Sequence, residues 1–293
     1  MNVLKYIGFA AFFVVAFIVS LYLTFPWDAA KDFALQQASK ATGMELHAKS
    51  LEPSWITGVV AKDLEIRTPS LEEPISLAEV KARGHILPLL TGGRGVTADL
   101  PIAQGTVHAD VVDSSDRTQL EAELKGIQIA LVPGLQDAIG VPLTGKLDLD
   151  ADLDLDKAKP EASSGTIKIA GAGLELLKGG KVAGMTLPFE LSIGDFSWTI
   201  PITEGKAKLD KLGIKGDSVE LELDGTLTLN ADLSRSVPNL VVKFKPTDAF
   251  LKKEPLLNAL LANINRAKGS DGFYAYTLTG SLKHPRFAMR RGG

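Results

Sequence analysis

The chain has 293 residues, of which 45% are hydrophobic and 23% are charged, and its formal net charge is −3. A chain of this length and hydrophobic content can bury a sizeable core, so the composition excludes a disordered tail. The near-neutral charge balance argues against nucleic acid as a partner. The lack of cysteine does not decide between reducing and oxidising compartments, because a domain of this size does not need disulfides.

The first segment is an uncharged apolar run that predicts a transmembrane helix. It extends from Tyr6 to Phe25, and at about 1.5 Å per residue such a helix spans roughly 30 Å of hydrocarbon. A cleaved signal peptide is the alternative, but its apolar core is only about 7–15 residues long, and Asp28-Ala29-Ala30 is a poor cleavage site. We therefore expect an uncleaved anchor over residues 1–27, with the anchor residues Tyr6, Phe9, Phe12, Phe13, Phe17, Leu21, Tyr22, Phe25 and Trp27.

Charge and capping signals around the anchor predict its orientation and the element that follows. Lys5 and the amino terminus are the cations before the apolar run, and Tyr22 and Trp27 suit the opposite interface. This predicts a single-pass protein of a bacterial inner membrane, with its amino terminus inside and its carboxy-terminal part in the periplasm. Residues 28–43 then predict a juxtamembrane amphipathic helix, with Asp28 as N-cap and Gly43 as the residue that ends it.

Residues 44–293 form short alternating runs broken by Gly, Pro, Asp and Asn, which indicates successive antiparallel strands. Helices are few, and the pattern predicts two, Leu131–Ile139 and Thr247–Ala267. The predicted strands are Met44–Ser50, Val59–Arg67, Ile75–Ala82, Ile102–Asp110, Gln119–Ala130, Thr144–Asp156, Gly165–Ala170, Leu187–Ile193, Lys206–Leu212, Ser218–Ala231, Asn239–Lys245 and Gly272–Leu282.

So many strands with so few helices raise the question of what covers their apolar faces. Each alternating strand has one apolar face that must be buried, and two short helices cannot cover them all. Three solutions remain open: a second sheet, closure into a barrel, or a curled sheet whose inner face is a groove for apolar ligand or lipid.

A Leu-x-Gly-x-Leu pattern recurs at residues 143–147, 223–227 and 278–282. The two leucines and the glycine share one face of a strand, and a glycine there permits a bend or bulge. We therefore interpret Gly145, Gly225 and Gly280 as sheet-bending glycines, with ordinary hairpin punctuation as the alternative. The leucine-rich faces around them define a candidate apolar groove: Leu143, Leu147, Leu149, Leu153, Leu155, Val219, Leu221, Leu223, Leu227, Leu229, Leu278 and Leu282.

The acidic run from Asp148 to Asp156, with aspartate at every second position, admits a metal site or a polar strand face. An EF-hand loop that starts at Asp150 would need glycine at its sixth position, where this chain has Leu155. In an extended strand, same-face residues lie roughly 6.6–6.8 Å apart, too far to share one cation at about 2.3–2.6 Å per bond. The pattern therefore favours a strand, with aspartates that serve solubility.

Other enzyme signatures are weak. The four histidines, His47, His85, His108 and His284, lack metal-ligand spacing, so they predict strand-surface or loop residues. Val182 stands where a phosphate loop needs Ser or Thr after Gly179-Gly180-Lys181, and residues 92–95 favour a turn. The basic residues Lys283, Arg286, Arg290 and Arg291 favour a solvated tail over contact with anionic headgroups or a partner. We expect no catalytic residue, metal or cofactor.

Two stretches resemble known bacterial proteins. Thr42-Gly43 followed by residues 44–48, and then Trp55-Ile56-Thr57-Gly58 followed by the strand over residues 59–66, resemble the opening of AsmA-like proteins. The Leu-x-Gly-x-Leu strands and the closing run from Tyr274 to Arg286 resemble the type II secretion system protein N family, also called general secretion pathway protein N. The resemblance covers nearly the whole chain.

The resemblance implies an accessory, non-enzymatic component of the type II secretion system, anchored in the inner membrane, whose partners are other components of that system. Its AsmA-like side implies that residues 44–293 form a curved antiparallel β-sheet with a groove, suited to lipid binding, lipid transport or envelope maintenance, with acyl chains as ligands. An extracytoplasmic calcium-stabilised enzyme is a third, weaker hypothesis. The predicted fold is mostly β, with an N-terminal transmembrane helix and a few short helices.

Overall fold

The computed structural model describes residues 27–42, 44–54, 57–67, 74–90, 92–136, 141–182, 185–262 and 264–290. The predicted anchor from Tyr6 to Phe25 lies outside these ranges, as do its residues Phe9, Phe12, Phe13, Phe17, Leu21 and Tyr22. Within the described ranges, no helix combines the length and the hydropathy needed to span a bilayer.

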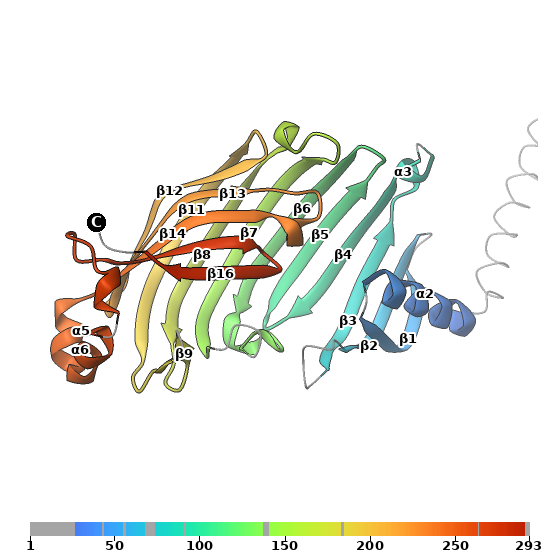
Figure 1. Cartoon of the computed structure of the whole chain (residues 1–293). Helices are drawn as coiled ribbons and strands as arrows, with labels where there is room; N and C mark the ends of the chain where they lie inside the picture. The colour runs from blue at the N-terminus through green and yellow to red at the C-terminus, as the bar shows by residue number, and fades with distance from the viewer. Residues whose placement is uncertain are drawn as a thin grey trace, which may run out of the picture.

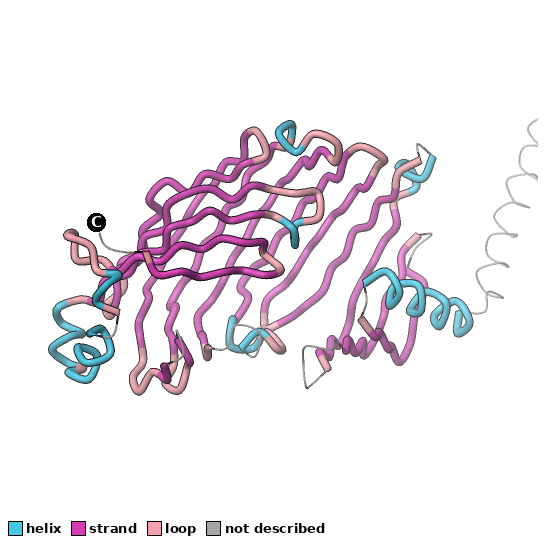
Figure 2. Tube along the Cα trace, viewed as in Figure 1, coloured by secondary structure: helices cyan, strands magenta, loops and turns pink. Residues whose placement is uncertain are grey.

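The fold is one antiparallel sheet of 14 strands in which each strand pairs with the next one along the chain (Figures 1 and 2). The sheet is not closed, and β1 and β16 are its two ends. A small hairpin, β9 (Lys181–Val182) with β10 (Met185–Thr186), lies between β8 and β11. The strands of the large sheet are β1 (Glu45–Ser54), β2 (Gly58–Arg67), β3 (Ile75–Gly84), β4 (Arg94–Ile102), β5 (Gly105–Asp113), β6 (Arg117–Gln128), β7 (Leu143–Asp156), β8 (Ser164–Leu176), β11 (Leu191–Thr203), β12 (Lys206–Lys215), β13 (Val219–Thr228), β14 (Val237–Pro246), β15 (Tyr274–Ser281) and β16 (His284–Met289). The prediction of a mostly β fold with few helices is confirmed.

Helices are short and stand at the margins of the sheet (Figure 1). The helix α2 (Trp27–Thr42) occupies the range predicted for the juxtamembrane helix and packs against β1, where the Leu46 N–H donates to Ser39 Oγ at 3.0 Å. The other helical segments are α3 (Ile86–Leu90), α5 (Asp248–Lys253), α6 (Pro255–Ala262) and the 3₁₀ turns η1 (Ile129–Leu131), η2 (Pro160–Ala162), η3 (Leu233–Arg235) and η4 (Asn265–Ala267).

The alternation of side chains gives the sheet one apolar face and one polar face. On β7, Leu149 pairs with Leu124 of β6 and with Ile169 of β8, so three apolar side chains lie in a row on one face. Asp150, the next residue, pairs with Glu123 and Lys168 on the opposite face. We call the face that carries Leu149 the inner face and the face that carries Asp150 the outer face.

The sheet curls so that its carboxy-terminal strands cover part of the inner face. Leu155 of β7 is 1% exposed and Ile202 of β11 is 1% exposed, and none of the eight buried residues of the cluster that contains them lies in a helix. Such burial of one face of a sheet requires other apolar side chains against it. Leu240 of β14, five strands beyond β7 in the sheet, belongs to the same cluster. We call this cluster the strand core: Leu153, Leu155, Ile200, Ile202, Ala207, Leu209, Leu229 and Leu240.

The helices α5 and α6 form a second core near one end of the curled strands. Phe250, Leu257 and Leu261 pack with Leu176 at the end of β8 and Tyr274 at the start of β15. We call this cluster the helix core: Leu176, Leu187, Phe189, Phe250, Leu257, Leu261, Ala267 and Tyr274. The phenyl rings of Phe189 and Phe250 meet edge to face, with their centroids 5.4 Å apart.

The single helix predicted over Thr247–Ala267 is wrong, because the chain forms two helices and a 3₁₀ turn there. Thr247 begins α5, with its hydroxyl accepting from the Phe250 N–H at 3.3 Å. The break falls at Glu254, whose φ of −121° and ψ of 78° are not helical. Pro255 explains it, because proline disfavours helical geometry in the residue before it and lacks an N–H to continue the ladder.

Other predicted boundaries also differ from the structure. The strand predicted over Ile102–Asp110 is interrupted by a turn at Ala103 and Gln104, whose φ values are 51° and 62°. Residues 92–95 were expected to form a turn, but β4 begins at Arg94 within this glycine cluster, so the strand was not predicted. Residues 284–289 of the tail expected to be solvated form β16, and all of them are exposed. The strand β11 extends to Thr203. Of the helix predicted over Leu131–Ile139, residues 137–140 lie outside the described ranges.

The three glycines of the Leu-x-Gly-x-Leu pattern all have positive φ: 120° at Gly145, 130° at Gly225 and 91° at Gly280. The pairing of β7 with β8 shifts register at Gly145. At Gly225, a Cβ atom would lie 2.3 Å from the Asn239 carbonyl oxygen of the neighbouring strand. Since other residues rarely adopt such φ values and backbone cannot easily move aside, Gly225 is a position where only glycine fits.

We expect Gly225→Ala to lower the free energy of unfolding by about 2–4 kcal/mol, because it adds left-handed strain to a backbone clash. Gly213→Ala on β12 is the matched control, since its Cβ would meet nothing closer than the Leu221 carbonyl oxygen at 3.8 Å. Denaturant melts of the two variants measure the difference. Equal stabilities would contradict a steric requirement for glycine at position 225.

Candidate functional site

The candidate site is the part of the inner face that the curl leaves uncovered. The strand registers place inner-face residues in rows that cross the sheet. One row joins Leu100, Val107, Leu124, Leu149, Ile169 and Trp198 from β4 to β11. A parallel row joins Val96, Val111, Leu120, Leu153, Gly165 and Ile202. Both rows are wholly apolar.

Between these two rows lies a row of small side chains. Ala82, Ala98, Ala109, Ala122 and Ala151 are successive cross-strand partners from β3 to β7. Their methyl groups are bordered by larger Val and Leu side chains on either side. We call this row of five alanines the alanine floor. From β4 to β7 this floor spans roughly 14 Å, three strand spacings of about 4.8 Å. The row continues into Ile167 and Ile200, so the floor leads directly to the strand core.

Exposure changes sharply along β7. Leu147 and Leu149 are partly exposed, whereas Ala151, Leu153 and Leu155 are buried. On β4, β5 and β6 the apolar side chains of the two rows are partly exposed, and Val96 is 48% exposed. The inner face is therefore buried around Ile200 and Ile202 of β11 and partly exposed along the two rows on β4, β5 and β6, which makes these rows the candidate apolar groove.

Aromatic rings line the inner face on β11, β14 and β15. The rings of Phe196 and Trp198 on β11 lie 4.2 Å apart between centroids, and Phe244 on β14 stacks on Tyr274 at 5.2 Å. Burial raises the pKa of the Tyr274 and Tyr276 phenols. Both hydroxyls therefore stay protonated and neutral near pH 7, and this end of the inner face also presents no charge to a ligand.

The predicted groove residues divide between core and groove. Leu153, Leu155 and Leu229 belong to the strand core, and Leu223, Leu227 and Leu278 pack against it. Val219 is buried, and Leu143, Leu147, Leu149 and Leu221 are partly exposed on strands. Leu282 is 48% exposed in the turn between β15 and β16. The alanine floor escaped the sequence analysis because β4 was missed, and with it the register that aligns Ala98 with Ala109.

Asp148, Asp150 and Asp154 of β7 each have a separate partner on the outer face. Asp148 accepts from the Gly126 N–H at 2.6 Å, Asp150 lies 3.4 Å from Lys168 Nζ, and Asp154 lies 2.7 Å from Arg117 Nη1. Backbone N–H donors from Lys159 and Ala158 hold the pKa of Asp156 below its usual value. Within the described ranges, no group of three or more His, Asp or Glu side chains is placed to hold a metal ion.

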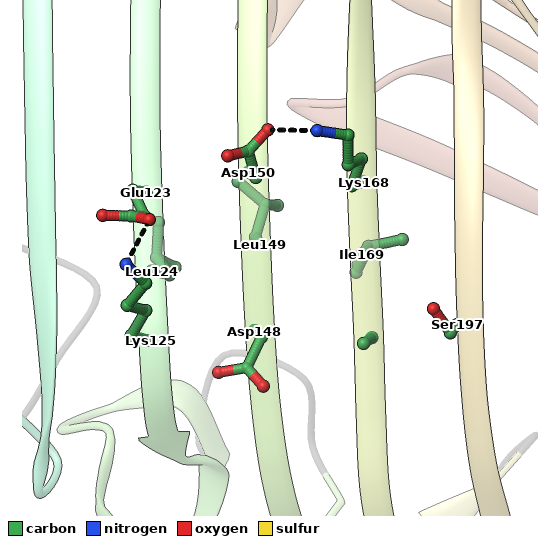
Figure 3. A pocket seen from close by; sticks show the side chains of 10 residues that line it. Glu123, Leu124, Lys125, Asp148, Leu149, Asp150, Lys168, Ile169 and Ser197 are labelled. Atoms are coloured by element: carbon green, nitrogen blue, oxygen red, sulfur yellow. Dashed lines mark hydrogen bonds and ion pairs between the residues drawn. The ribbon is translucent and has the colours of Figure 1, made fainter.

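A shallow depression of about 360 Å³ lies among these outer-face charges on β6 to β11 (Figure 3). It forms where the short side chains of Ala170 and Ser197 pair across strands. Its charged groups already pair within the sheet, Glu123 with Lys125 at 2.5 Å and Asp150 with Lys168 at 3.4 Å. Solvated and internally paired, the depression offers a ligand less than the inner face does.

The described histidines are distributed over separate elements: His47 on β1, His85 before α3, His108 on β5 and His284 on β16. His108 Nδ1 lies 2.6 Å from Asp99 Oδ1, and this hydrogen bond raises the His108 pKa. His85 Nε2 lies 2.7 Å from Thr97 Oγ1 and 3.1 Å from Asp110 Oδ2. Since one nitrogen serves both contacts, this group lacks the relay geometry of a catalytic triad.

Comparisons with known proteins add no assignment. The chain matches no protein-family model, no curated protein and no solved structure. The geometry of the inner face therefore carries the functional argument.

Core and groove leucines should respond differently to truncation. Leu155→Ala removes side-chain atoms from a position that is 1% exposed, so we expect it to cost about 2–5 kcal/mol of unfolding free energy. Leu149→Ala, on the same strand and face but partly exposed, should cost less than half as much, because fewer protein contacts are lost. Denaturant melts of both variants give the comparison. Equal costs would mean that the groove at Leu149 is covered.

Proposed function

We propose that this protein is a non-enzymatic module that holds the hydrocarbon chains of lipids in its open inner face, as a curved, AsmA-like β-groove. The observation that supports this most is that one continuous apolar surface is buried in the strand core and partly exposed along the two rows on β4, β5 and β6. A monomer rarely leaves a large contiguous apolar surface exposed unless something binds there.

The chemistry of the lining favours hydrocarbon as the ligand. The side chains of the two rows and of the alanine floor offer no hydrogen-bond donor or acceptor, apart from the indole N–H of Trp198. A polar ligand would lose its hydrogen bonds to water there without replacing them, at a cost of a few kcal/mol each. An acyl chain has no hydrogen bonds to water to lose, and its binding is favoured by about 25 cal/mol per Å² of apolar surface removed from water.

The proposed location fits this ligand. In our proposal, residues 1–27 anchor the protein in a bacterial inner membrane, with α2 beside the membrane and the β-sheet in the periplasm. The apolar run before α2 supports this arrangement. The groove would then lie within reach of a lipid source.

Adjacent residues on β7 provide a direct test. A photoreactive amino acid in place of Leu149, introduced into the full chain in cells, should form lipid adducts after illumination, because that side chain faces the groove. The same substitution of Asp148 should not, since it points to the outer face. Mass spectrometry of the purified protein detects the adducts. Lipid adducts at both positions, or at neither, would contradict the proposal.

We also propose a second function, as an accessory component of the type II secretion system that binds other components of that system. The residues that resemble this family near the carboxy terminus, 274–286, form β15 and the start of β16. The strand β16 ends the sheet, and it exposes Phe287 and Met289 on the inner face. An unpaired edge with exposed apolar side chains is suited to pairing with another chain.

Exoprotein export tests this second function. Deleting the gene should reduce export of folded exoproteins, and Phe287→Glu should reduce it as well, because a charge is placed on the free edge. Leu256→Glu on α6 is the control, since Leu256 is 65% exposed and Phe287 is 67% exposed. Quantitative assays of culture supernatant provide the measurement. Unchanged export in the deletion strain under several inducing conditions would count against this function.

A further inference from the structure

Charge is almost absent from the inner face. From β4 to β16, the strand registers place two charged residues there, Arg94 and Asp113. The two are cross-strand partners, and they share a row with Thr118 of β6. This row borders Val96 and Val111, so both charges lie at one rim of the apolar groove.

The carboxylate of Asp113 already has two partners, Lys157 and Thr118. Its carboxylate accepts from Thr118 Oγ1 at 2.6 Å and lies 2.8 Å from Lys157 Nζ. These contacts, together with the more distant charge of Arg94, hold the pKa of Asp113 below its usual value. The carboxylate therefore stays ionised and paired with Lys157, which leaves the guanidinium of Arg94 as the uncompensated charge of this row.

Arg94 is exposed, and it makes no ion pair within 4.0 Å with any carboxylate in the described part of the chain. Other charged groups near this rim form hydrogen bonds with residues other than Arg94. Lys157 also donates to the Ser114 carbonyl oxygen, and Asp116 accepts from Ser114 Oγ at 3.2 Å. A guanidinium presents several donors in a fixed plane that match carboxylate and phosphate oxygens.

We infer that the groove selects anionic amphiphiles, with a carboxylate or phosphate headgroup bound by Arg94 and the acyl chain lying over the alanine floor. The inference rests on the proposed lipid-binding function and names its ligand class. Arg94 and Ala98 are four residues apart on β4, roughly 13–14 Å. The long arginine side chain can therefore hold a headgroup at the rim while the chain begins at Val96 and follows Ala98, Ala109 and Ala122 towards the strand core.

Two photoreactive probes that differ only in headgroup test the inference on the full chain in non-ionic detergent. The probes are diazirine-bearing hexadecanoate, which is anionic, and the corresponding diazirine-bearing hexadecanol, which is neutral. The variants are Arg94→Gln, which removes the charge, and Arg94→Lys, which keeps it. Arg83→Gln is the matched control, because Arg83 pairs with Thr97 on the outer face of the neighbouring strand.

We expect Arg94→Gln to weaken labelling by hexadecanoate about tenfold and to leave hexadecanol labelling unchanged. Arg94→Lys should retain most of the binding, and Arg83→Gln should match the wild type with both probes. Inorganic phosphate at equal concentration should displace neither probe, because it lacks the chain.

The inference is overturned if Arg94→Gln leaves hexadecanoate labelling unchanged, if it affects both probes equally, or if phosphate alone competes as well as unlabelled hexadecanoate. Failure of the wild-type protein to be labelled by either probe would instead remove the proposed function itself. The two failures are therefore distinguishable in one experiment.

Discussion

The structure depends on one constraint: an antiparallel strand with alternating side chains has an apolar face that water does not favour, and this chain has 14 such strands with little helix to cover them. The sheet meets the constraint by covering itself. Leu240 of β14 belongs to the same buried cluster as Leu153 and Leu155 of β7, while α5 and α6 pack at the adjoining strand ends. The two apolar rows stay partly exposed on β4, β5 and β6, so the same constraint that builds the core also leaves apolar surface on the inner face.

Local pattern was enough to predict much of the fold. Alternation identified most strands, including β7, and it separated the aspartates from the leucines because side chains on a strand reverse direction at every residue. Alternation did not predict the structure where glycine or proline is compatible with more than one local conformation. Gly95 lies within β4 but resembles a turn, and Pro255 divides a helix that the leucine pattern presents as continuous.

The groove itself could not be predicted from single strands. Ala98, Ala109 and Ala122 are unremarkable within their own segments, and they form a floor only after pairing brings them into register. Leu149 is partly exposed while Leu155, on the same strand and face, is buried. This difference depends on how the sheet curls, which is a long-range property. Arg94 is likewise an ordinary surface residue until the register places it on the apolar face. The proposed lipid site lies on β4–β7, and the proposed partner edge is β16, which ends the sheet.

The order of the strands has a consequence for how the chain folds. Each strand pairs with its predecessor, so the sheet can grow from sequence-local contacts as the chain leaves the ribosome. The strand core is different, because Leu155 must wait for Leu240, and residues 156–239 have to be synthesised in between. During that interval the nascent sheet has an uncovered inner face and a newly formed open edge at each step. The aspartates of β7 can then also limit aggregation. While β7 is the edge of the growing sheet, their repeated charge disfavours pairing with another nascent chain until β8 of the same chain is synthesised.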